Sequence, residues 1–303
     1  MVKQSAEAIL GNPLSYRLIS SGVRPRSLVL AFHNVLPEGT KPRGDRSLHL
    51  PVEAFCEVVD WLAEAFEVVP LDQAFGPVNA ESEKPRAAIT FDDAYDGAIS
   101  VAIPELWRRR LPATVFAISE AEPGQTFWWD ALADGFPDGM PQPIREAALT
   151  EARGAESAVR AWAAKRGCSL ATLDGEFVAA PWDAIRRASR LPGITIASHT
   201  RTHPNLGALE AEELASELEG SRIQLQQIIP ESRPWLACPY GLSTPTVERA
   251  AEVAGYELSF RVMGGVVLSR DAAPSPHALP RLNIAAGMSL RGLRLRAVGL
   301  LGR

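Results

Sequence analysis

The sequence predicts an α/β fold in which parallel strands alternate with helices. Short apolar runs suited to buried strands alternate with longer segments whose apolar residues recur at helical spacing. The length of 303 residues fits either two average domains or one α/β barrel. Apolar residues make up 46% of the chain, enough to build a large core. Because strands joined through helices pair in parallel, we expect one parallel sheet surrounded by helices.

The expected strands are continuous apolar runs, a pattern typical of parallel strands that are covered on both faces. In chain order they are SLVLAF (27–32), FEVV (66–69), RAAITF (86–91), ATVFAI (113–118), GITIA (193–197), WLAC (235–238) and LSFR (258–261). The expected helices lie at 51–66, 96–110, 209–228 and 244–254. In the first of these helices the apolar residues fall on one face, which can pack against the sheet.

The alternation of strands and helices is interrupted between about residues 120 and 190. Turn-forming glycines and prolines come first, followed by an Ala-rich helix near 145–166. Candidate site residues lie on both sides of this stretch. We therefore interpret it as an insertion into a single domain that spans residues 1–303.

The C-terminal segment, about 287–303, is basic and carries four arginines and no acid. It is expected to form a helix. One interpretation is an amphipathic helix that contacts a membrane surface or a partner, and the other is a helix that caps the fold.

Composition excludes several classes of protein. The net charge of −5 (31 − 36) argues against a nucleic-acid partner, whose binding protein would be basic. The cysteines, Cys56, Cys168 and Cys238, are odd in number and far apart, which disfavours disulfides and a cysteine zinc site. No apolar run is long enough for a membrane span, and the N-terminus lacks the apolar stretch of a signal peptide. These features predict a cytoplasmic protein.

Two acidic residues follow the strand at 86–91, within TFDDAYDG (90–97). At a bend after a strand, Asp92 and Asp93 can both approach one pocket, where one carboxylate binds a metal and the other moves a proton. The alternative is that an aspartate here only caps the next helix.

Two histidines follow the strand at 193–197, within SHTRTHP (198–204). On a helical turn, the i, i+4 spacing of His199 and His203 places both on one face, where neutral imidazoles can bind one divalent ion. The alternative is an ordinary pair of loop histidines. Asp93 would complete a set of two histidines and one carboxylate, which leaves positions open for water and substrate.

Two further strand ends carry candidate residues. The strand at 235–238 runs into a Pro-Tyr-Gly turn, where the Tyr240 N–H is either an oxyanion donor or part of an ordinary turn. His33 ends the first strand and is either a general acid or a core histidine. His49 and His277 lie in loops and are expected on the surface.

Together the three motifs resemble those of the polysaccharide deacetylase family, the NodB-like carbohydrate esterases. TFDDAYDG is similar to T-F-D-D-[GA], SHTRTHP to H-[ST]-x-x-[HN]-P, and RPWLACPYG (233–241) to R-x-x-x-x-x-P-[YW]-G. The resemblance implies an α/β fold of the family type, a distorted (β/α)7 barrel with an inserted segment, over about residues 25–285. It also implies hydrolysis of acetyl groups on an N-acetylated oligosaccharide or polysaccharide.

The resemblance also implies roles for individual residues. Asp92 would be the general base. Arg233 would orient Asp92 and lower its pKa through an ion pair. Tyr240 would give its N–H to the oxyanion. One divalent metal, most often zinc, would be held by Asp93, His199 and His203.

The Leu-x-x-His motif that usually supplies the general acid has no clear copy near the C-terminus. Instead, FHNV (32–35) resembles the [YF]-H-x-[VI] segment of circularly permuted, exopolysaccharide-type members, which implies His33 as the acid in preference to His277. FWWD (127–130) and LPRL (279–282) resemble further segments of such members. The candidate substrate contacts are Trp128, Trp129, Pro239 and Arg281.

Three alternatives stay open from the sequence. The two tryptophans can instead pack the insertion onto the barrel. The same site can hydrolyse a non-sugar amide. The chain can also be a catalytically dead homologue that only binds carbohydrate, although retention of all four motif acids and histidines argues against this.

Overall fold

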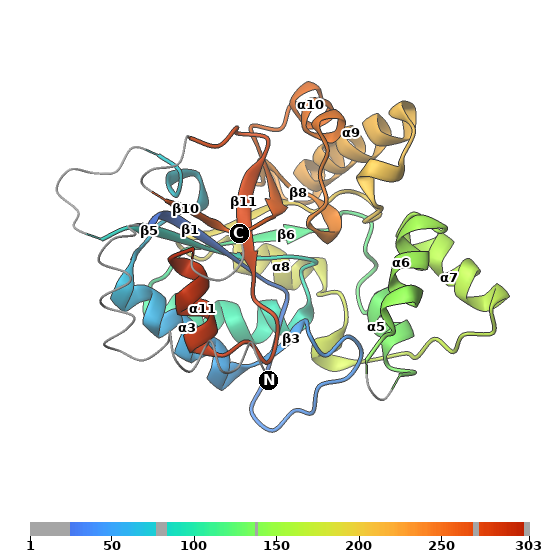
Figure 1. Cartoon of the computed structure of the whole chain (residues 1–303), viewed down its shortest axis with the longest axis horizontal. Helices are drawn as coiled ribbons and strands as arrows, with labels where there is room; N and C mark the ends of the chain where they lie inside the picture. The colour runs from blue at the N-terminus through green and yellow to red at the C-terminus, as the bar shows by residue number, and fades with distance from the viewer. Residues whose placement is uncertain (1–24, 77–83, 137–138, 269–272, 300–303) are drawn as a thin grey trace.

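The computed structural model describes residues 25–76, 84–136, 139–268 and 273–299. Seven parallel strands close into a barrel around which the helices pack (Figure 1). In order around the ring they are β1 (Pro25–Phe32), β5 (Arg86–Phe91), β6 (Ala113–Ala117), β7 (Ile194–Ser198), β8 (Arg233–Ala237), β9 (Leu258–Val262) and β11 (Leu279–Asn283). The ring closes because β1 pairs with β5 on one side and with β11 on the other.

Alternate residues of the barrel strands pack in two different layers. Val29 of β1 belongs to the barrel interior, where Phe116 of β6 contacts Phe260 of β9 with ring centroids 5.7 Å apart. Leu28 and Leu30 belong to the other layer, between the strands and the surrounding helices. Both faces of the strands are therefore buried, which explains their continuous apolar sequence.

Four helices around the barrel lie close to their expected positions, and one more, at Trp182–Ser189, was not expected. They are α3 (Val52–Ala65), α4 (Ile103–Arg109, preceded by a π-helical turn at Ala98–Ala102), α8 (Trp182–Ser189), α9 (Ala211–Ile228) and α10 (Pro245–Val253). At the start of α9, Glu210 and Glu213 form a reciprocal capping box, and Thr244 caps α10.

One of the seven strands that form the barrel differs from the expected set. The run at 66–69 forms only the two-residue β4 (Glu67–Val68), which pairs with the start of β5, before the first β6 pairing. The seventh strand of the ring is β11, which was not expected because Pro280 and Arg281 interrupt its apolar pattern. A short β10 (Val266–Leu268) pairs antiparallel with β1, and β2 (Asn34–Leu36) pairs with β3 (His49–Pro51) in a separate sheet.

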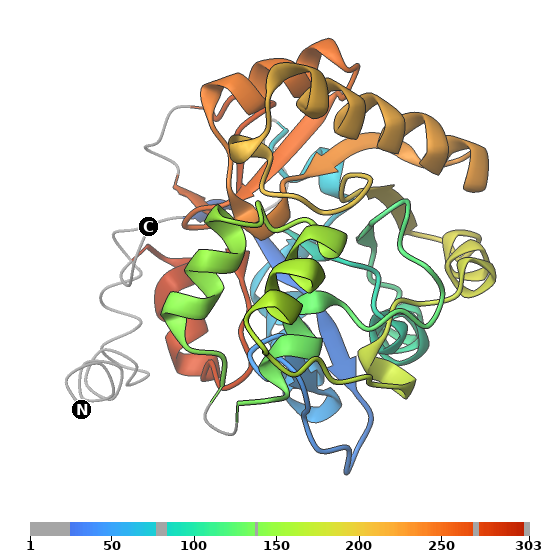
Figure 2. The ribbon, with the colours of Figure 1, turned by 90° about the vertical axis from the view of Figure 1, so that its right-hand side faces the viewer.

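Besides α8, the interrupted stretch contains three helices that lie to one side of the barrel, α5 (Trp128–Ala133), α6 (Gln142–Thr150) and α7 (Glu156–Lys165). Figure 2, in which this side faces the viewer, shows them in front of the strands. The expected single helix near 145–166 is two helices, because Arg153 and Gly154 adopt left-handed backbone with φ of 53° and 69°. A side chain at Gly154 would also come within 2.7 Å of the Tyr240 ring. From here on, "the insertion" means α5 to α7 with their connections.

The basic C-terminal segment forms α11 (Leu290–Ala297), which packs on the barrel. Its apolar side chains, Leu293 and Leu295, are buried in the protein, and Arg294 lies over the Trp61 ring of α3. These apolar side chains are therefore not available to a membrane, and the helix caps the fold. Arg303 lies outside the described residues. Among the helices that the structure describes, none combines the length and apolarity needed to cross a bilayer.

Candidate active site

The three sequence motifs meet in one cavity at the carboxyl ends of the barrel strands. Because parallel strands end at the same edge, the turns after β5, β7 and β8 are brought together there. The cavity measures about 260 Å³. Its polar and aromatic lining consists of His33, Asp45, Ser47, Asp92, Asp93, Trp129, Arg145, His199, His203, Tyr240 and Asn283.

The motif turns concentrate left-handed backbone. Within the described ranges, seven residues other than glycine have positive φ, and five of these belong to the motifs. The five are Asp93, Ala94, Thr200, His203 and Tyr240. Such a conformation costs an ordinary residue of order 1–3 kcal/mol and persists only where the surrounding structure enforces it. The fold therefore maintains these turns at a cost, as expected of a functional site.

Three buried side chains, Asp93, His199 and His203, point at one another. The two Nε2 atoms lie 3.2 Å apart, and each lies 3.4 Å from Asp93 Oδ1. One ligand atom from each residue falls within a span of 4.8 Å. Asp93 Oδ1 is buried and has no hydrogen-bond donor among the described residues. A carboxylate and two imidazoles so placed are a donor set that fits a divalent metal with open coordination positions.

The hydrogen bonds of the triad support this fit. His199 Nδ1 lies 2.8 Å from the Ala237 carbonyl and donates to it, which directs Nε2 toward Asp93. Burial and the neighbouring His199 lower the pKa of His203 to about 3, so its imidazole is neutral at neutral pH. Burial also disfavours the charged form of His199, but the charges of Asp92 and Asp93 outweigh it and raise the pKa of His199. A proton on His199 would therefore compete with a metal.

Asp92 is held by a buried arginine. Arg281 of β11 donates from Nη1 and Nη2 to the two carboxylate oxygens at 2.7 and 2.8 Å. Nη1 also donates to Thr90 Oγ1 at 3.1 Å, and the guanidinium lies over the Phe116 ring. Burial would raise the pKa of Asp92, but the charge of Arg281, with that of His199, holds it well below its usual range. Asp92 is therefore ionised and faces the same cavity as the triad.

The prediction that Arg233 pairs with Asp92 is wrong. Arg233 is the first residue of β8, so the strand places it at the amino end of the barrel, away from Asp92. Its side chain is 50% exposed, lies over the Trp235 ring and has Asp72 as its ion-pair partner at 3.7 Å. Arg281 takes the predicted position instead.

Arg281 is also not the substrate contact that the sequence predicted. Its side chain is fully buried, and both terminal nitrogens bind Asp92. It therefore positions Asp92. The sequence did offer one indication of this role. Arg281 stands within an otherwise apolar run, and a charged residue there is rarely buried without a partner of opposite charge.

His33, the expected general acid, lies at the same cavity. It follows β1 directly and lines the cavity with Asp92 and Asp93. Its Nδ1 is buried and has no partner among the described residues. His277 precedes β11 and therefore lies at the amino end of the barrel, away from the cavity.

Tyr240 connects the third motif to the insertion. Its hydroxyl lies 2.7 Å from the Gly154 carbonyl and 3.1 Å from the His203 carbonyl, and it accepts from Trp128 Nε1 at 3.1 Å. Pro239, beside it, is buried. Trp128 is fully buried, so the prediction that it contacts the substrate is wrong. Its indole packs the insertion onto the barrel.

Trp129 does line the cavity. Its ring centroid lies 4.7 Å from that of His203, and its Nε1 donates to the Tyr95 hydroxyl at 2.6 Å. Tyr95 in turn donates to Asp130 at 2.6 Å, and His49 Nε2 lies 3.0 Å from the same carboxylate. The expectation that His49 is a surface residue is therefore wrong, because it is fully buried in this network.

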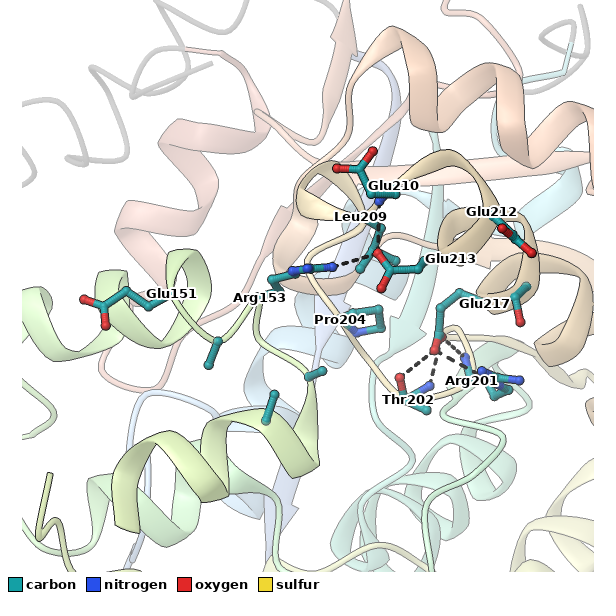
Figure 3. A pocket seen from close by; sticks show the side chains of 14 residues that line it. Glu151, Arg153, Arg201, Thr202, Pro204, Leu209, Glu210, Glu212, Glu213 and Glu217 are labelled. Carbon is teal, nitrogen blue, oxygen red and sulfur yellow. Dashed lines mark hydrogen bonds and ion pairs between the residues drawn. The ribbon is translucent and has the colours of Figure 1, made fainter. Parts of the chain in front are cut away.

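Glu217 shapes the turn between His199 and His203, a role that sequence reasoning missed. From α9 it accepts from the backbone N–H groups of Arg201 and Thr202 at 3.0 Å each, and from Thr202 Oγ1 at 2.6 Å. Figure 3 shows these bonds at the edge of a larger cavity of about 720 Å³. That cavity is lined by none of the motif acids or histidines, and its Glu213 is paired with Arg153. We therefore place the chemistry in the smaller cavity.

A closed barrel of seven parallel strands, with acids and histidines gathered at the strand ends, places a candidate active site at the carboxyl face of an α/β barrel. A family model described as polysaccharide deacetylase matches residues 79–259, which hold all three motifs. The chain therefore belongs to the polysaccharide deacetylase family, a family of hydrolytic deacetylases. No curated protein matches the sequence.

Solved structures of other proteins share the fold. The structure of IcaB from Ammonifex degensii superposes with a TM-score of 0.60 at 16% sequence identity. The match covers 91% of this chain and 98% of the IcaB chain. Deacetylase PplD from Streptococcus pyogenes, in complex with acetate, superposes with a TM-score of 0.59 at 16% sequence identity. That match covers 89% of this chain and 97% of the PplD chain. A de-N-acetylase from Aggregatibacter actinomycetemcomitans superposes with a TM-score of 0.58 at 17% sequence identity, and the match covers 88% of this chain and 98% of the de-N-acetylase chain. These likenesses confirm the barrel.

Proposed function

We propose that the protein hydrolyses the acetyl group from an N-acetylated sugar of an oligosaccharide or polysaccharide. The observation that carries this proposal is the pairing of two differently held carboxylates in one cavity. Asp92 is kept ionised by Arg281, while Asp93 faces His199 and His203. The structural likeness to a de-N-acetylase supports an N-acetyl rather than an O-acetyl bond as the target.

The triad is proposed to hold one divalent metal, zinc being the ion most often bound by such a set. When bound, the metal would supply Lewis acidity and a water of lowered pKa. His203 is neutral, and the Nδ1 proton of His199 is donated to the Ala237 carbonyl, so each histidine can offer Nε2 as the metal ligand atom. We expect affinity to weaken as the pH falls and His199 takes up a proton.

The remaining steps fall to side chains of the chain itself. A carboxylate oxygen of Asp92 accepts a proton from the attacking water, because Arg281 leaves the second lone pair of each oxygen free. The imidazole of His33 donates a proton to the leaving nitrogen. The backbone N–H of Tyr240 is proposed to stabilise the oxyanion, and Trp129 forms the apolar wall of the cavity.

The test is acetate release from N-acetylglucosamine oligomers by the zinc- or cobalt-loaded chain and its Asp92→Asn variant. General base catalysis typically contributes about 10²- to 10⁴-fold, so we expect the variant to lose turnover by that factor while it retains the metal. A variant that keeps near-normal rates would show that Asp92 is not the base. Wild-type protein that releases acetate only from non-sugar amides would show that the substrate is not a glycan.

A further inference from the structure

The catalytic cavity contains a charged pair that none of the motifs includes. Asp45 comes from the loop between β2 and β3, and Arg145 comes from α6 in the insertion. The two side chains form an ion pair, with Arg145 Nη2 donating to Asp45 Oδ2. Both line the same cavity as Asp92 and His33. The pair therefore places a hydrogen-bond donor and a hydrogen-bond acceptor in the cavity beside the proposed catalytic side chains.

The loop around Asp45 is fixed from α5. The Asp45 N–H donates to Asp130 Oδ1 at 2.8 Å, and the Gly44 N–H donates to Asp134 Oδ1 at 3.0 Å. Gly44 has φ of 64°, and a Cβ there would come within 2.4 Å of Asp130 Oδ1, so the position requires glycine. Ser47 donates to Asp45 Oδ1 from its hydroxyl at 2.7 Å. The Asp45 carboxylate is thus oriented before any ligand enters.

The pair retains hydrogen-bonding capacity. A guanidinium carries five N–H donors, and Asp45 occupies only Nη2 of Arg145, whose side chain is 31% exposed. Asp45 Oδ2 accepts one bond from Arg145 and keeps a second lone pair. A donor beside an acceptor is complementary to a hydroxyl group, which both donates and accepts.

We infer that Asp45 and Arg145 bind hydroxyl groups of the sugar ring whose acetyl group is removed. The inference rests on the proposed function and adds a recognition site to it. The cavity of about 260 Å³ lies just below the range of about 300–1,000 Å³ that encloses drug-sized ligands, so it accommodates one ring rather than several. Trp129 presents its apolar ring to the same space.

The competing explanation is that the ion pair only fastens α6 to the barrel. In that case its removal loosens the cavity for every substrate equally. The test therefore compares two acetyl substrates, an N-acetylglucosamine oligomer and 4-nitrophenyl acetate, which has an acetyl group but no hydroxyls. The variants are Arg145→Ala and Asp45→Asn in the metal-loaded chain. The control is Arg166→Ala, which removes an exposed ion pair with Glu151 elsewhere in the insertion.

We expect kcat/KM for the glycan to fall about 10- to 100-fold in each variant, mainly through KM, because charge-assisted hydrogen bonds to the substrate are lost. The ratio of the glycan rate to the aryl acetate rate should fall at least tenfold, whereas the Arg166→Ala control should keep the wild-type ratio. Arg145→Lys, which keeps the charge but not the planar fork, should give an intermediate ratio.

Two outcomes would overturn the inference while the proposed function stands. If the glycan and aryl acetate rates fall together, the Asp45–Arg145 ion pair only holds α6 against the barrel. If neither rate falls, the pair does not touch the substrate. If the wild-type chain hydrolyses the aryl acetate and no acetylated sugar, the proposed function itself fails, and the inference fails with it.

Discussion

The motif turns and the insertion contribute to the same cavity in different ways. The turns after β1, β5 and β7 supply the carboxylates and imidazoles of the proposed chemistry, and each turn is a short, contiguous stretch of sequence. The insertion supplies Trp129 and Arg145, whose partners are distant in the chain. The reacting groups are thus encoded locally, whereas the shape and recognition properties of the cavity depend on long-range contacts.

The largest effect is expected from breaking the ion pair between β5 and β11. Arg281→Ala leaves Asp92 buried without its cation, which should reduce the free energy of unfolding by about 3–5 kcal/mol. The matched control is Arg233→Ala, which removes an exposed arginine and should change it by less than about 0.5 kcal/mol. Urea unfolding measures both. Equal effects in the two variants would contradict the assignment of Arg281.

The same pair predicts a pH dependence. Because the pKa of Asp92 in the folded protein lies below its ordinary value of 3.8, the stabilisation is fully present above that pH and is lost as the pH falls below it. In a folded Arg281→Ala variant, burial acts without the cation and should raise the pKa of Asp92. The acid limb of its pH–rate profile should therefore move to higher pH. An unmoved limb would mean that Arg281 does not set the ionisation of Asp92.

A smaller effect is expected in the turn between the two histidines. Glu217→Ala removes the acceptor for Arg201 and Thr202, so zinc affinity should fall about 10- to 100-fold, as for other residues that orient metal ligands. Glu213→Ala, on the same helix and paired with exposed Arg153, is the control and should leave affinity unchanged. Competition with a zinc chelator measures both. Unchanged affinity in Glu217→Ala would show that the turn holds without it.

The smallest effect is expected where the third motif contacts the insertion. Tyr240→Phe removes the hydroxyl that bonds the Gly154 and His203 carbonyls, which should cost about 0.5–1.5 kcal/mol of unfolding free energy. The variant keeps the backbone N–H proposed for the oxyanion, so kcat should fall much less than in Asp92→Asn. Thermal unfolding and acetate release measure the two effects. A kcat as low as that of Asp92→Asn would assign the side chain a direct catalytic role.

The sequence predicted what depends on nearby residues. The strand ends place Asp93, His199 and His203 at one edge of a parallel barrel, and the structure brings them together. Sequence reasoning chose the wrong arginine for Asp92. The true partner lies 189 positions away, in a strand that was not recognised because a proline and an arginine interrupt its apolar pattern. His49 was misplaced for a related reason.

The partner of His49, Asp130, is 81 positions away, and a polar residue in a loop gives no local sign that it is buried. The same holds for Trp128, whose indole donates to Gly154 and Tyr240, and for Asp45 and Arg145, which are 100 positions apart. Apart from the Trp128–Gly154 bond, which lies within the insertion, each of these contacts forms only when the insertion folds onto the barrel. A single sequence shows the residues but not their pairing.

The most direct test of the account is the divalent metal content of the purified chain and of its Asp93→Ala variant, each incubated with zinc and then freed of excess. Asp93 supplies the only carboxylate of the triad. We predict about one ion per wild-type chain, a loss of that ion in the variant, and acetate release only from the loaded wild type. No bound ion in either protein, or equal binding by both, would contradict the assignment of Asp93, His199 and His203 as the metal site.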